Sequence, residues 1–337
     1  MDWSITKLLC LRQCHRKFYF AHELANHHFT HPLRRKAFEL AQSKSLKMWQ
    51  GSLVDYAFSK LLIPRYQQKE SIDFEEIADE IIDIATRQYE FSRKGLYRQK
   101  GMSKTKVGEE FLILDIHESG VPYLEADISE VYATVRDIIM QIPHYGSPEG
   151  GKSLHEYLIA SSFLRSDINN WHFQFGDLRI KPQIDLVRYR SKAIHVIDWK
   201  VSESNSSDYS TQLYLAGIVA FHNIKKDYQE KEWEIPAMED ISLFEVNLMN
   251  GQIKEHAFTK ESTAAALDYV YRFQSEQEQL SSDKKWHELN VEDYQTTDKS
   301  ETCVFCKFKP LCIHLLLNNN RYDEGQYYQL VQNQELA

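Results

Sequence analysis

Two aspartates and a lysine on neighbouring apolar segments are the residues of this sequence best suited to chemistry. Asp185 lies at the start of one apolar run, and Asp198 and Lys200 end the next. Both runs have the β-branched content of short strands, and the polar stretch around Ser191 and Lys192 predicts a tight hairpin between them. Such a hairpin places Asp185 directly opposite Asp198, with Cβ atoms about 5 Å apart. Two carboxylates at that distance repel unless a proton or a cation lies between them.

The lysine belongs to the same cluster because side chains alternate along a strand. Lys200 shares a face with Asp198, and Trp199 points to the other side. An Asp-x-Lys pattern alone is typical of a surface ion pair. Here it ends an apolar strand and faces Asp185, which favours a functional site.

The N-terminal part of the chain is predicted to be helical. We expect helices over residues 4–24, 36–62 and 72–93, the second of them containing Gly51 and Asp55 and ended by Pro64. A strand is predicted at 111–116 and a helix at 128–142, followed by a loop and a short helix from Ser153. This middle portion is interpreted as a helical insert without recognisable chemistry.

The second half of the chain has the pattern of a sheet. Strands are predicted from residue 171 through the two runs that carry the aspartates, then a helix with Gln212 in its first turn. Further strands flank Asn250 and Gly251, a strong hairpin signal, and a helix follows over about 260–280.

Charge is unevenly distributed along the chain, which has 337 residues and a net charge of -9. Residues 7–47 hold nine Lys or Arg against two Glu, and residues 87–106 hold seven against Glu90. These stretches are interpreted either as a basic stripe that binds nucleic acid or as solvated helix faces.

Three of the five cysteines form a C-terminal motif, Cys303-x2-Cys306-x5-Cys312, and the others are Cys10 and Cys14. In an intracellular protein this usage favours metal binding over disulfides. Cys14 is the expected fourth ligand, and Cys10 is interpreted as a small buried hydrophobe. A 4Fe-4S cluster is favoured, with Zn²⁺ and unligated thiols as alternatives.

No stretch of the sequence has the character of a membrane span. The longest apolar run, residues 214–221, is far shorter than a bilayer span, and the N-terminus lacks the pattern of a secretory signal. We expect a soluble cytoplasmic protein.

Taken in order, these motifs resemble the PD-(D/E)XK nuclease superfamily, and within it the RecB-like branch with an iron-sulfur cluster, which includes AddB-type helicase-nuclease subunits and the nucleases of CRISPR adaptation. The match runs through the Ser4 helix with Cys14-His-Arg-Lys-Phe-Tyr-Phe, the strand with Asp185, the strand Val196-Ile-Asp-Trp-Lys200, Gln212-Leu213 and the cysteine triplet. Three positions depart from the branch: Asp55 stands near the place of its upstream histidine, Pro182 replaces a glycine, and Ala216 replaces a tyrosine.

The resemblance implies an α/β fold with a restriction-endonuclease-like core, a central mixed sheet flanked by helices, a helical insert, and N- and C-terminal regions joined by the cluster. The expected divisions are 1–62 (N-terminal helices), 63–152 (insert), 153–281 (nuclease core) and 282–337 (cysteine region).

The resemblance also implies an activity and its residues. We expect a deoxyribonuclease, and by analogy with the branch an exonuclease, that hydrolyses single-stranded DNA or DNA ends. Its expected role is repair, recombination or defence against foreign DNA, with a helicase or other protein partner. Asp185 and Asp198 would bind Mg²⁺ or Mn²⁺ with Asp55, Lys200 would act on the attacking water, and Gln212 would position it. The alternative is a catalytically weakened nuclease-fold module that binds nucleic acid or a partner protein.

Overall fold

The chain folds into two compact units, each assembled from separate stretches of sequence. The computed structural model describes residues 2–27, 31–99, 101–166, 168, 170–190, 193–202, 209–281 and 284–334. The first, called the sheet unit, comprises Met1–Ile5, Gln50–Ile81 and Ala133–Arg272. The second, called the helical unit, comprises Thr6–Trp49, Ile82–Tyr132 and Phe273–Ala337.

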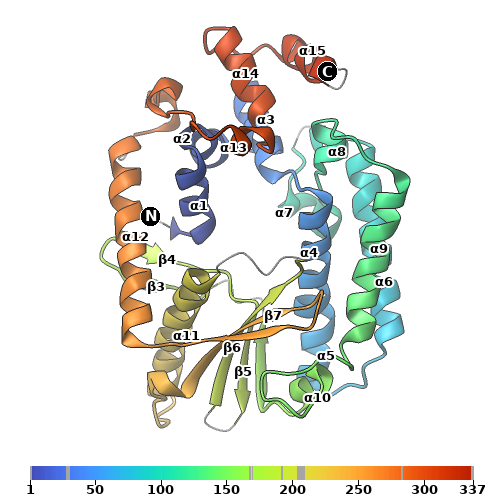
Figure 1. Ribbon diagram of the computed structural model, residues 1–337, viewed down its shortest axis with the longest axis vertical. Helices are drawn as coiled ribbons and strands as arrows, with labels where there is room; N and C mark the ends of the chain where they lie inside the picture. The colour runs from blue at the N-terminus through green and yellow to red at the C-terminus, as the bar shows by residue number, and fades with distance from the viewer. Residues whose placement is uncertain are drawn as a thin grey trace. The chain divides into compact units, whose positions relative to one another are not determined.

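The sheet unit is built on a five-stranded mixed sheet with the strand order β2-β5-β6-β7-β8 (Figure 1). Strand β6 pairs antiparallel with β5 and parallel with β7. The parallel pair requires a crossover, and helix α11 supplies it. The bounds are β2 (Phe163–Ser166), β5 (Leu186–Arg190), β6 (Ala193–Lys200), β7 (Ile241–Asn247), β8 (Ile253–His256) and α11 (Ser210–Glu230). The predicted mixed α/β fold is confirmed, and it has the arrangement of a restriction-endonuclease-like core.

Both faces of the central strand are covered, which explains its nearly continuous apolar run. Helix α11 packs against β6 and β7. On the opposite face the ring of Phe58, from η2 (Ala57–Leu62), lies 4.7 Å from the ring of Trp199. Ile194, Val196 and Ile197 are buried between these layers.

Gly217 allows α11 to approach the sheet closely. A Cβ at this position would lie 2.9 Å from both Leu243 and Phe258 side-chain atoms. No real Cβ tolerates such a contact without movement of its neighbours. The close approach brings the first turn of α11, with Gln212, to the end of β6.

A second, smaller sheet with the order β1-β4-β3 lies in the same unit. Its strands are β1 (Asp2–Trp3), β3 (Phe173–Phe175) and β4 (Leu178–Ile180). Gly176 has a φ of +56° in the turn between β3 and β4, a conformation that favours glycine. The predicted strand near residue 171 is thereby confirmed. The remaining elements wholly within the sheet unit are α5 (Ile63–Gln68), α10 (Leu154–Ile159) and η5 (Met238–Asp240).

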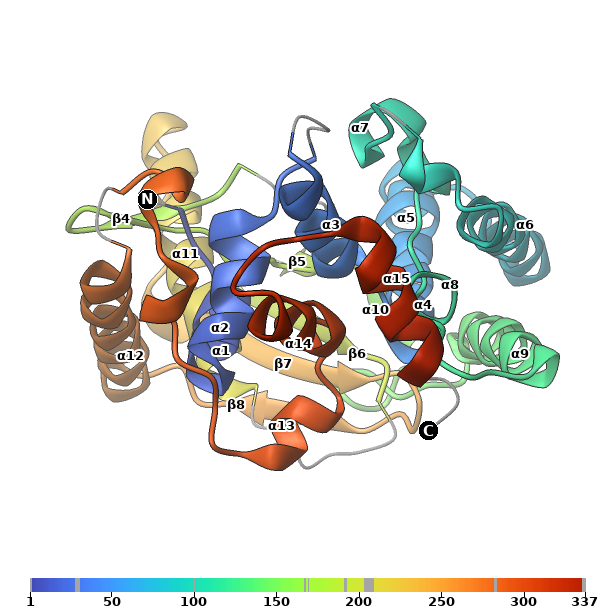
Figure 2. The same ribbon diagram turned by 90° about the horizontal axis from the view of Figure 1, so that it is seen from above.

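The helical unit contains the helices near both chain ends. Figures 1 and 2 show α1 and α2 beside α13 and α14. Helices α1, α4, α6, α9 and α12 have residues in both units. The bounds are α1 (Ile5–Gln13), α2 (His15–Phe18), η1 (Tyr19–Leu24), α3 (Pro32–Gln42), α4 (Leu46–Tyr56), α6 (Phe74–Arg93), η3 (Leu96–Arg98), α7 (Lys104–Val107), η4 (Gly108–Glu110), α8 (Asp115–Glu118), α9 (Glu125–Gln141), α12 (Lys260–Leu280), η6 (Trp286–Glu288), η7 (Val291–Asp293), α13 (Ser300–Val304), α14 (Lys309–Leu317) and α15 (Glu324–Gln334).

Four local predictions are wrong. The helix expected over 36–62 is divided, because α3 ends at Gln42, Lys44 forms an isolated bridge, and α4 begins at Leu46. The helix expected over 4–24 is interrupted at Cys14, whose backbone is extended, with φ -169° and ψ 121°. Pro64 does not end its helix, because α4, η2 and α5 follow one another without a break as far as Gln68, and the residues before the proline form the π-helical segment η2. The strand expected at 111–116 forms only an isolated bridge at Leu114, and its apolar residues pack into a local cluster instead.

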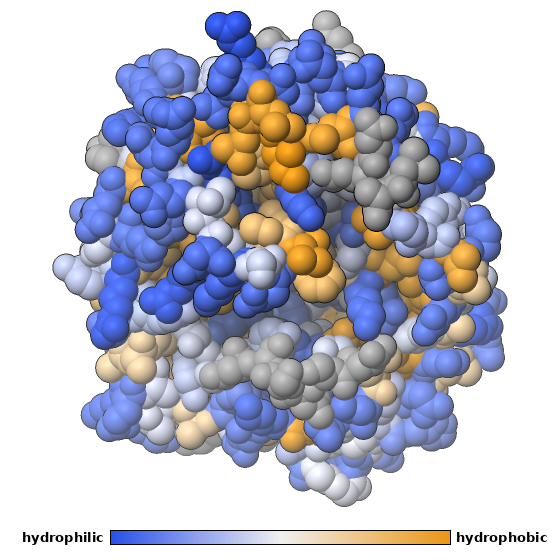
Figure 3. Space-filling model, turned by 45° about the horizontal axis from the view of Figure 1, so that its top comes forward, coloured by the Kyte–Doolittle hydropathy of each residue, from blue (hydrophilic) through white to orange (hydrophobic). Residues whose placement is uncertain are grey.

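Large apolar side chains are exposed around the cysteine motif. Phe305 is 89% exposed and Leu317 is 70% exposed, with Val304 and Leu316 also at the surface. Figure 3, in which the α13 and α14 region of Figure 1 is turned forward, shows hydrophobic residues gathered on the surface. Within the described residues, no helix combines the length and the apolar character needed to cross a membrane.

Candidate active site

Asp185 and Asp198 lie side by side because of the register between β5 and β6. The pairing runs from Arg190 opposite Ala193 to Leu186 opposite Ile197, so the next position in register sets Asp185 opposite Asp198. The predicted register is therefore confirmed, although the loop at Ser191 and Lys192 lies outside the described residues.

Asp185 is fixed against the backbone of the neighbouring strand. Its Oδ2 accepts a hydrogen bond of 2.9 Å from the N–H of Trp199. Burial, followed by the negative charges of Asp198 and Asp55, raises the pKa of Asp185 well above its ordinary value. The Trp199 N–H and Lys200 act in the opposite direction without overcoming it. This carboxylate is thus held in place in an environment short of positive charge.

Asp198 is held by two of the predicted residues. Lys200 Nζ forms an ion pair with Asp198 Oδ2, and Gln212 Nε2 donates a hydrogen bond of 2.9 Å to Oδ1. The Asp198 side chain is only 8% exposed. Burial raises its pKa, Lys200 lowers it, and the negative charges of Glu245 and Asp55 raise it further.

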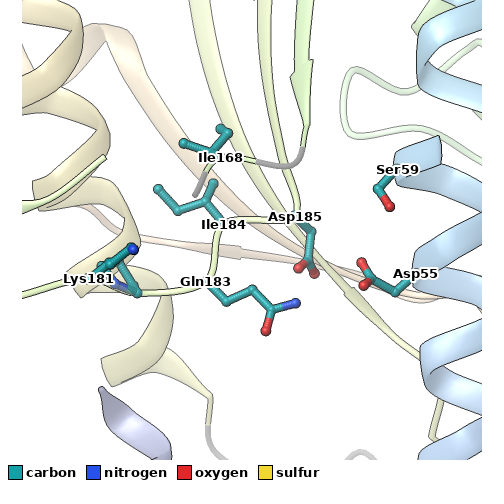
Figure 4. Close-up of a pocket in the computed structure, with 8 residues that line it drawn as sticks. Asp55, Ser59, Ile168, Lys181, Gln183, Ile184 and Asp185 are labelled. Carbon is teal, nitrogen blue, oxygen red and sulfur yellow. The ribbon is translucent and has the colours of Figure 1, made fainter. Parts of the chain in front are cut away.

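Asp55 approaches the pair from α4. Figure 4 shows its carboxylate facing that of Asp185, with Ser59 one turn further along the helical segment. Asp55 and Asp185 line a cavity of about 330 Å³. Its other lining residues are Ser59, Ile168, Lys181, Pro182, Gln183 and Ile184. The structure therefore brings together Asp55, Asp185, Asp198, Lys200 and Gln212 in one unit.

Sequence reasoning missed one acidic residue at this site. Glu245 of β7 is the register partner of Asp198 in the parallel β6-β7 pair. The sequence does contain a signal for Glu245, because it is a charged residue within the apolar run Leu243-Phe-Glu-Val. Its pairing with Asp198 was hidden because the long α11 crossover does not fix the strand register.

The acidic side chains fit a divalent cation by charge and by donor type. Asp55 and Asp198 raise the pKa of Asp185, Lys200 forms an ion pair with Asp198, and buried charges in proteins are normally paired or bound to metal. Hard cations prefer carboxylate oxygen ligands. Within the described ranges, no three His, Cys, Asp or Glu side chains are already arranged around a single metal position. Mg²⁺ commonly uses one or two carboxylates and retains several waters, so this arrangement remains suitable.

Ion pairs neutralise much of the second basic stretch. Arg87 pairs with Asp83, Glu109 and Glu110, and Arg93 pairs with Glu90. For these residues the structure favours ion-paired helix faces over a continuous basic stripe.

The cysteines gather in the helical unit. Burial raises the pKa of Cys306, and the thiols of Cys14 and Cys303 raise it further. Cys312 is affected in the same way by Cys14, Cys306 and Cys303. Burial raises the pKa of Cys10 to about 11. None of the five cysteines forms a disulfide. Among the described residues, the cysteines are not already arranged as a group of three or more ligands around one metal position.

Comparison with known proteins identifies the family of the chain. The family model of the PD-(D/E)XK nuclease superfamily matches residues 2–313. No curated protein matches the chain. The matched region contains both aspartates, Lys200, Gln212 and the cysteine triplet. Nucleases of this superfamily typically use Mg²⁺ or Mn²⁺, and the chain belongs to the PD-(D/E)XK nuclease superfamily.

Proposed function

We propose that the chain is a metal-dependent deoxyribonuclease that hydrolyses phosphodiester bonds in single-stranded DNA or at DNA ends. The observation that carries this proposal is the pair of adjacent buried carboxylates with Lys200 on one of them. Superfamily membership implies a nuclease and DNA binding. A role in repair, recombination or defence against foreign DNA follows from the resemblance to the RecB-like branch.

The residues of the site have distinct proposed roles. Asp185 and Asp198 would hold Mg²⁺ or Mn²⁺, with Asp55 facing them from α4. The cation, when bound, makes a water molecule more acidic and stabilises negative charge on the phosphate. Lys200 orients the attacking water and donates a hydrogen bond to the phosphate oxygen on which negative charge develops. Gln212 fixes the orientation of Asp198 through its hydrogen bond.

The cavity beside Asp185 supports action on accessible single strands. Its volume of about 330 Å³ falls within the lower part of the range for small-molecule sites. A phosphate that reaches Asp185 from this side would meet Lys181 and the amide of Gln183. An unpaired strand or a frayed end enters such a recess more readily than a stacked duplex.

We further propose that Cys14, Cys303, Cys306 and Cys312 hold a 4Fe-4S cluster, with Zn²⁺ as the alternative metal. The proximity of the thiols and the position of Cys14 at the break between α1 and α2 support this assignment. The exposed Phe305 and Leu317 nearby are consistent with a protein partner such as a helicase.

The test is cleavage of end-labelled DNA by the purified chain with Mg²⁺, with Mn²⁺ and with a chelator. Linear single strands, circular single strands and blunt duplexes should be compared. We expect metal-dependent loss of linear single strands, and retention of circles would identify an exonuclease. Binding of all three DNAs without any cleavage would instead favour a nuclease-fold binding module.

A further inference from the structure

Glu245 places a third acidic side chain in line with Asp185 and Asp198. It is the register partner of Asp198, and paired strands are about 4.8 Å apart. Register partners project to the same face of the sheet, so three neighbouring strand positions each carry an acid there. The effect of Glu245 on the pKa of Asp198 shows that the two side chains interact electrostatically.

A buried histidine from the next strand packs beside Glu245, whose Oε2 has no hydrogen-bond partner among the described residues. His256 Nε2 lies 3.5 Å from Glu245 Oε2, and the two side chains are 3% and 15% exposed. The His256 ring meets Tyr214 of α11 edge-on, with centroids 6.2 Å apart. The glutamate is therefore positioned by packed groups on β8 and α11 and is not a mobile surface side chain.

The arrangement is unfavourable for the protein without a cation. Like charges on directly paired residues destabilise a sheet, and Glu245 adds a charge beside an Asp198 that already faces Asp185. Lys254 is the register partner of Glu245 on β8, but this lysine is exposed, and in the described part of the chain no ion pair joins it to Glu245. A bound cation would therefore offset the negative charge of Glu245 more directly than Lys254 does.

We infer that Glu245, packed beside His256, strengthens divalent cation binding at Asp185 and Asp198 through its negative charge, without itself contacting substrate. The inference rests on the proposed function. Lys200 and Gln212 contact the two oxygens of Asp198, and Glu245 acts on this carboxylate through its charge. Residues that support metal ligands in this way typically contribute 10- to 100-fold in affinity.

The test is a titration of the intact chain with Mn²⁺, followed by electron paramagnetic resonance of the unbound ion. We expect Glu245→Gln to weaken Mn²⁺ binding about tenfold. His256→Gln should weaken it less, because the charge of Glu245 remains. Glu255→Gln is the matched control: Glu255 is exposed on β8, it pairs with Phe244 on the other face, and its loss changes net charge equally.

The outcomes separate this inference from the proposed function. Mn²⁺ binding by the wild type that Glu245→Gln leaves unchanged overturns the inference alone. Absence of Mn²⁺ binding by the wild type overturns both. Circular dichroism of the cation-free proteins completes the test, since loss of the fold in Glu245→Gln would show a structural role and also overturn the inference.

Discussion

Asp185 accepts a hydrogen bond from the backbone N–H of Trp199, the residue between Asp198 and Lys200. This bond ties the acid at the start of β5 to the strand that carries the other two residues. The two carboxylates are consequently held together by the sheet itself, and they stay close even though their charges repel. A site fixed in this way needs little rearrangement to receive a cation.

Replacing one carboxylate should make the cation-free protein more stable and remove its activity. Asp185→Asn removes a buried charge whose pKa is raised by burial and by the neighbouring Asp198 and Asp55, while the ion pair of Asp198 with Lys200 stays intact. We expect the free energy of unfolding in chelator to rise by about 1 kcal/mol, with a Tm higher by roughly 2 °C. Differential scanning calorimetry checks this. Asp268→Asn, at an exposed helix position, should change Tm little, and a lower Tm for Asp185→Asn would contradict the repulsion described here.

The hydrogen bond from Gln212 should matter for activity more than for folding. Gln212→Ala removes the 2.9 Å donor to Asp198 Oδ1 and leaves Lys200 as the contact that orients this carboxylate. We expect the cleavage rate to fall about 10- to 100-fold while the Tm changes by little. Gln229→Ala, at an exposed position of the same helix, provides the control. Equal rates for the two variants would remove Gln212 from the site.

Two glycines in helices of the sheet unit should respond in opposite ways to alanine. Gly217→Ala introduces a Cβ 2.9 Å from Leu243 and Phe258, which should cost about 1–3 kcal/mol, reduced by alanine's higher helix propensity. Gly51→Ala meets nothing within 4 Å and should stabilise by up to about 1 kcal/mol. Urea denaturation of both variants measures the difference. Similar changes for both would show that α11 is not packed as tightly as described.

Acid should destabilise the protein partly through His195. Burial, aided by Arg188, lowers the pKa of His195 to about 4, below its ordinary value near 6.5. The unfolded chain therefore binds a proton that the folded chain does not, so stability is complete above about pH 6.5 and is lost as pH falls towards 4. Between about pH 6.5 and 4, we expect His195→Gln to lose up to about 3 kcal/mol less unfolding free energy than the wild type. An unchanged pH profile in urea denaturation would show that His195 does not titrate in this way.

The cysteines should differ in their importance for metal content. Cys14→Ser and Cys303→Ser should each lose the metal, whereas Cys10→Ser, which removes the thiol interpreted as a buried hydrophobe, should retain it. The measurement is iron and zinc analysis of anaerobically purified protein, together with absorption near ~400 nm for a thiolate-ligated iron cluster. A colourless preparation containing zinc would replace the cluster with a zinc site, and metal loss in Cys10→Ser alone would exchange the roles of Cys10 and Cys14.

The sequence predicts the core of the site because its geometry is local. Asp185 and Asp198 are joined by a short hairpin, and short hairpins fix strand register. Glu245 was missed because its pairing with Asp198 crosses the whole of α11, and no local signal sets the register of a parallel pair. The strand expected at 111–116 does not form, because its apolar residues pack against residues from helical segments. This is a tertiary contact, which the local sequence pattern does not predict.

Metal-dependent cleavage by the two-aspartate site is the central claim, and one assay tests it most directly. Labelled single-stranded DNA is incubated with chelator-treated protein before and after Mn²⁺ is restored, in the wild type and in Asp198→Asn. We predict that the wild type cleaves only after Mn²⁺ is restored and that Asp198→Asn does not cleave in either condition. Cleavage by Asp198→Asn at the wild-type rate, or none by the wild type with Mn²⁺, would contradict it.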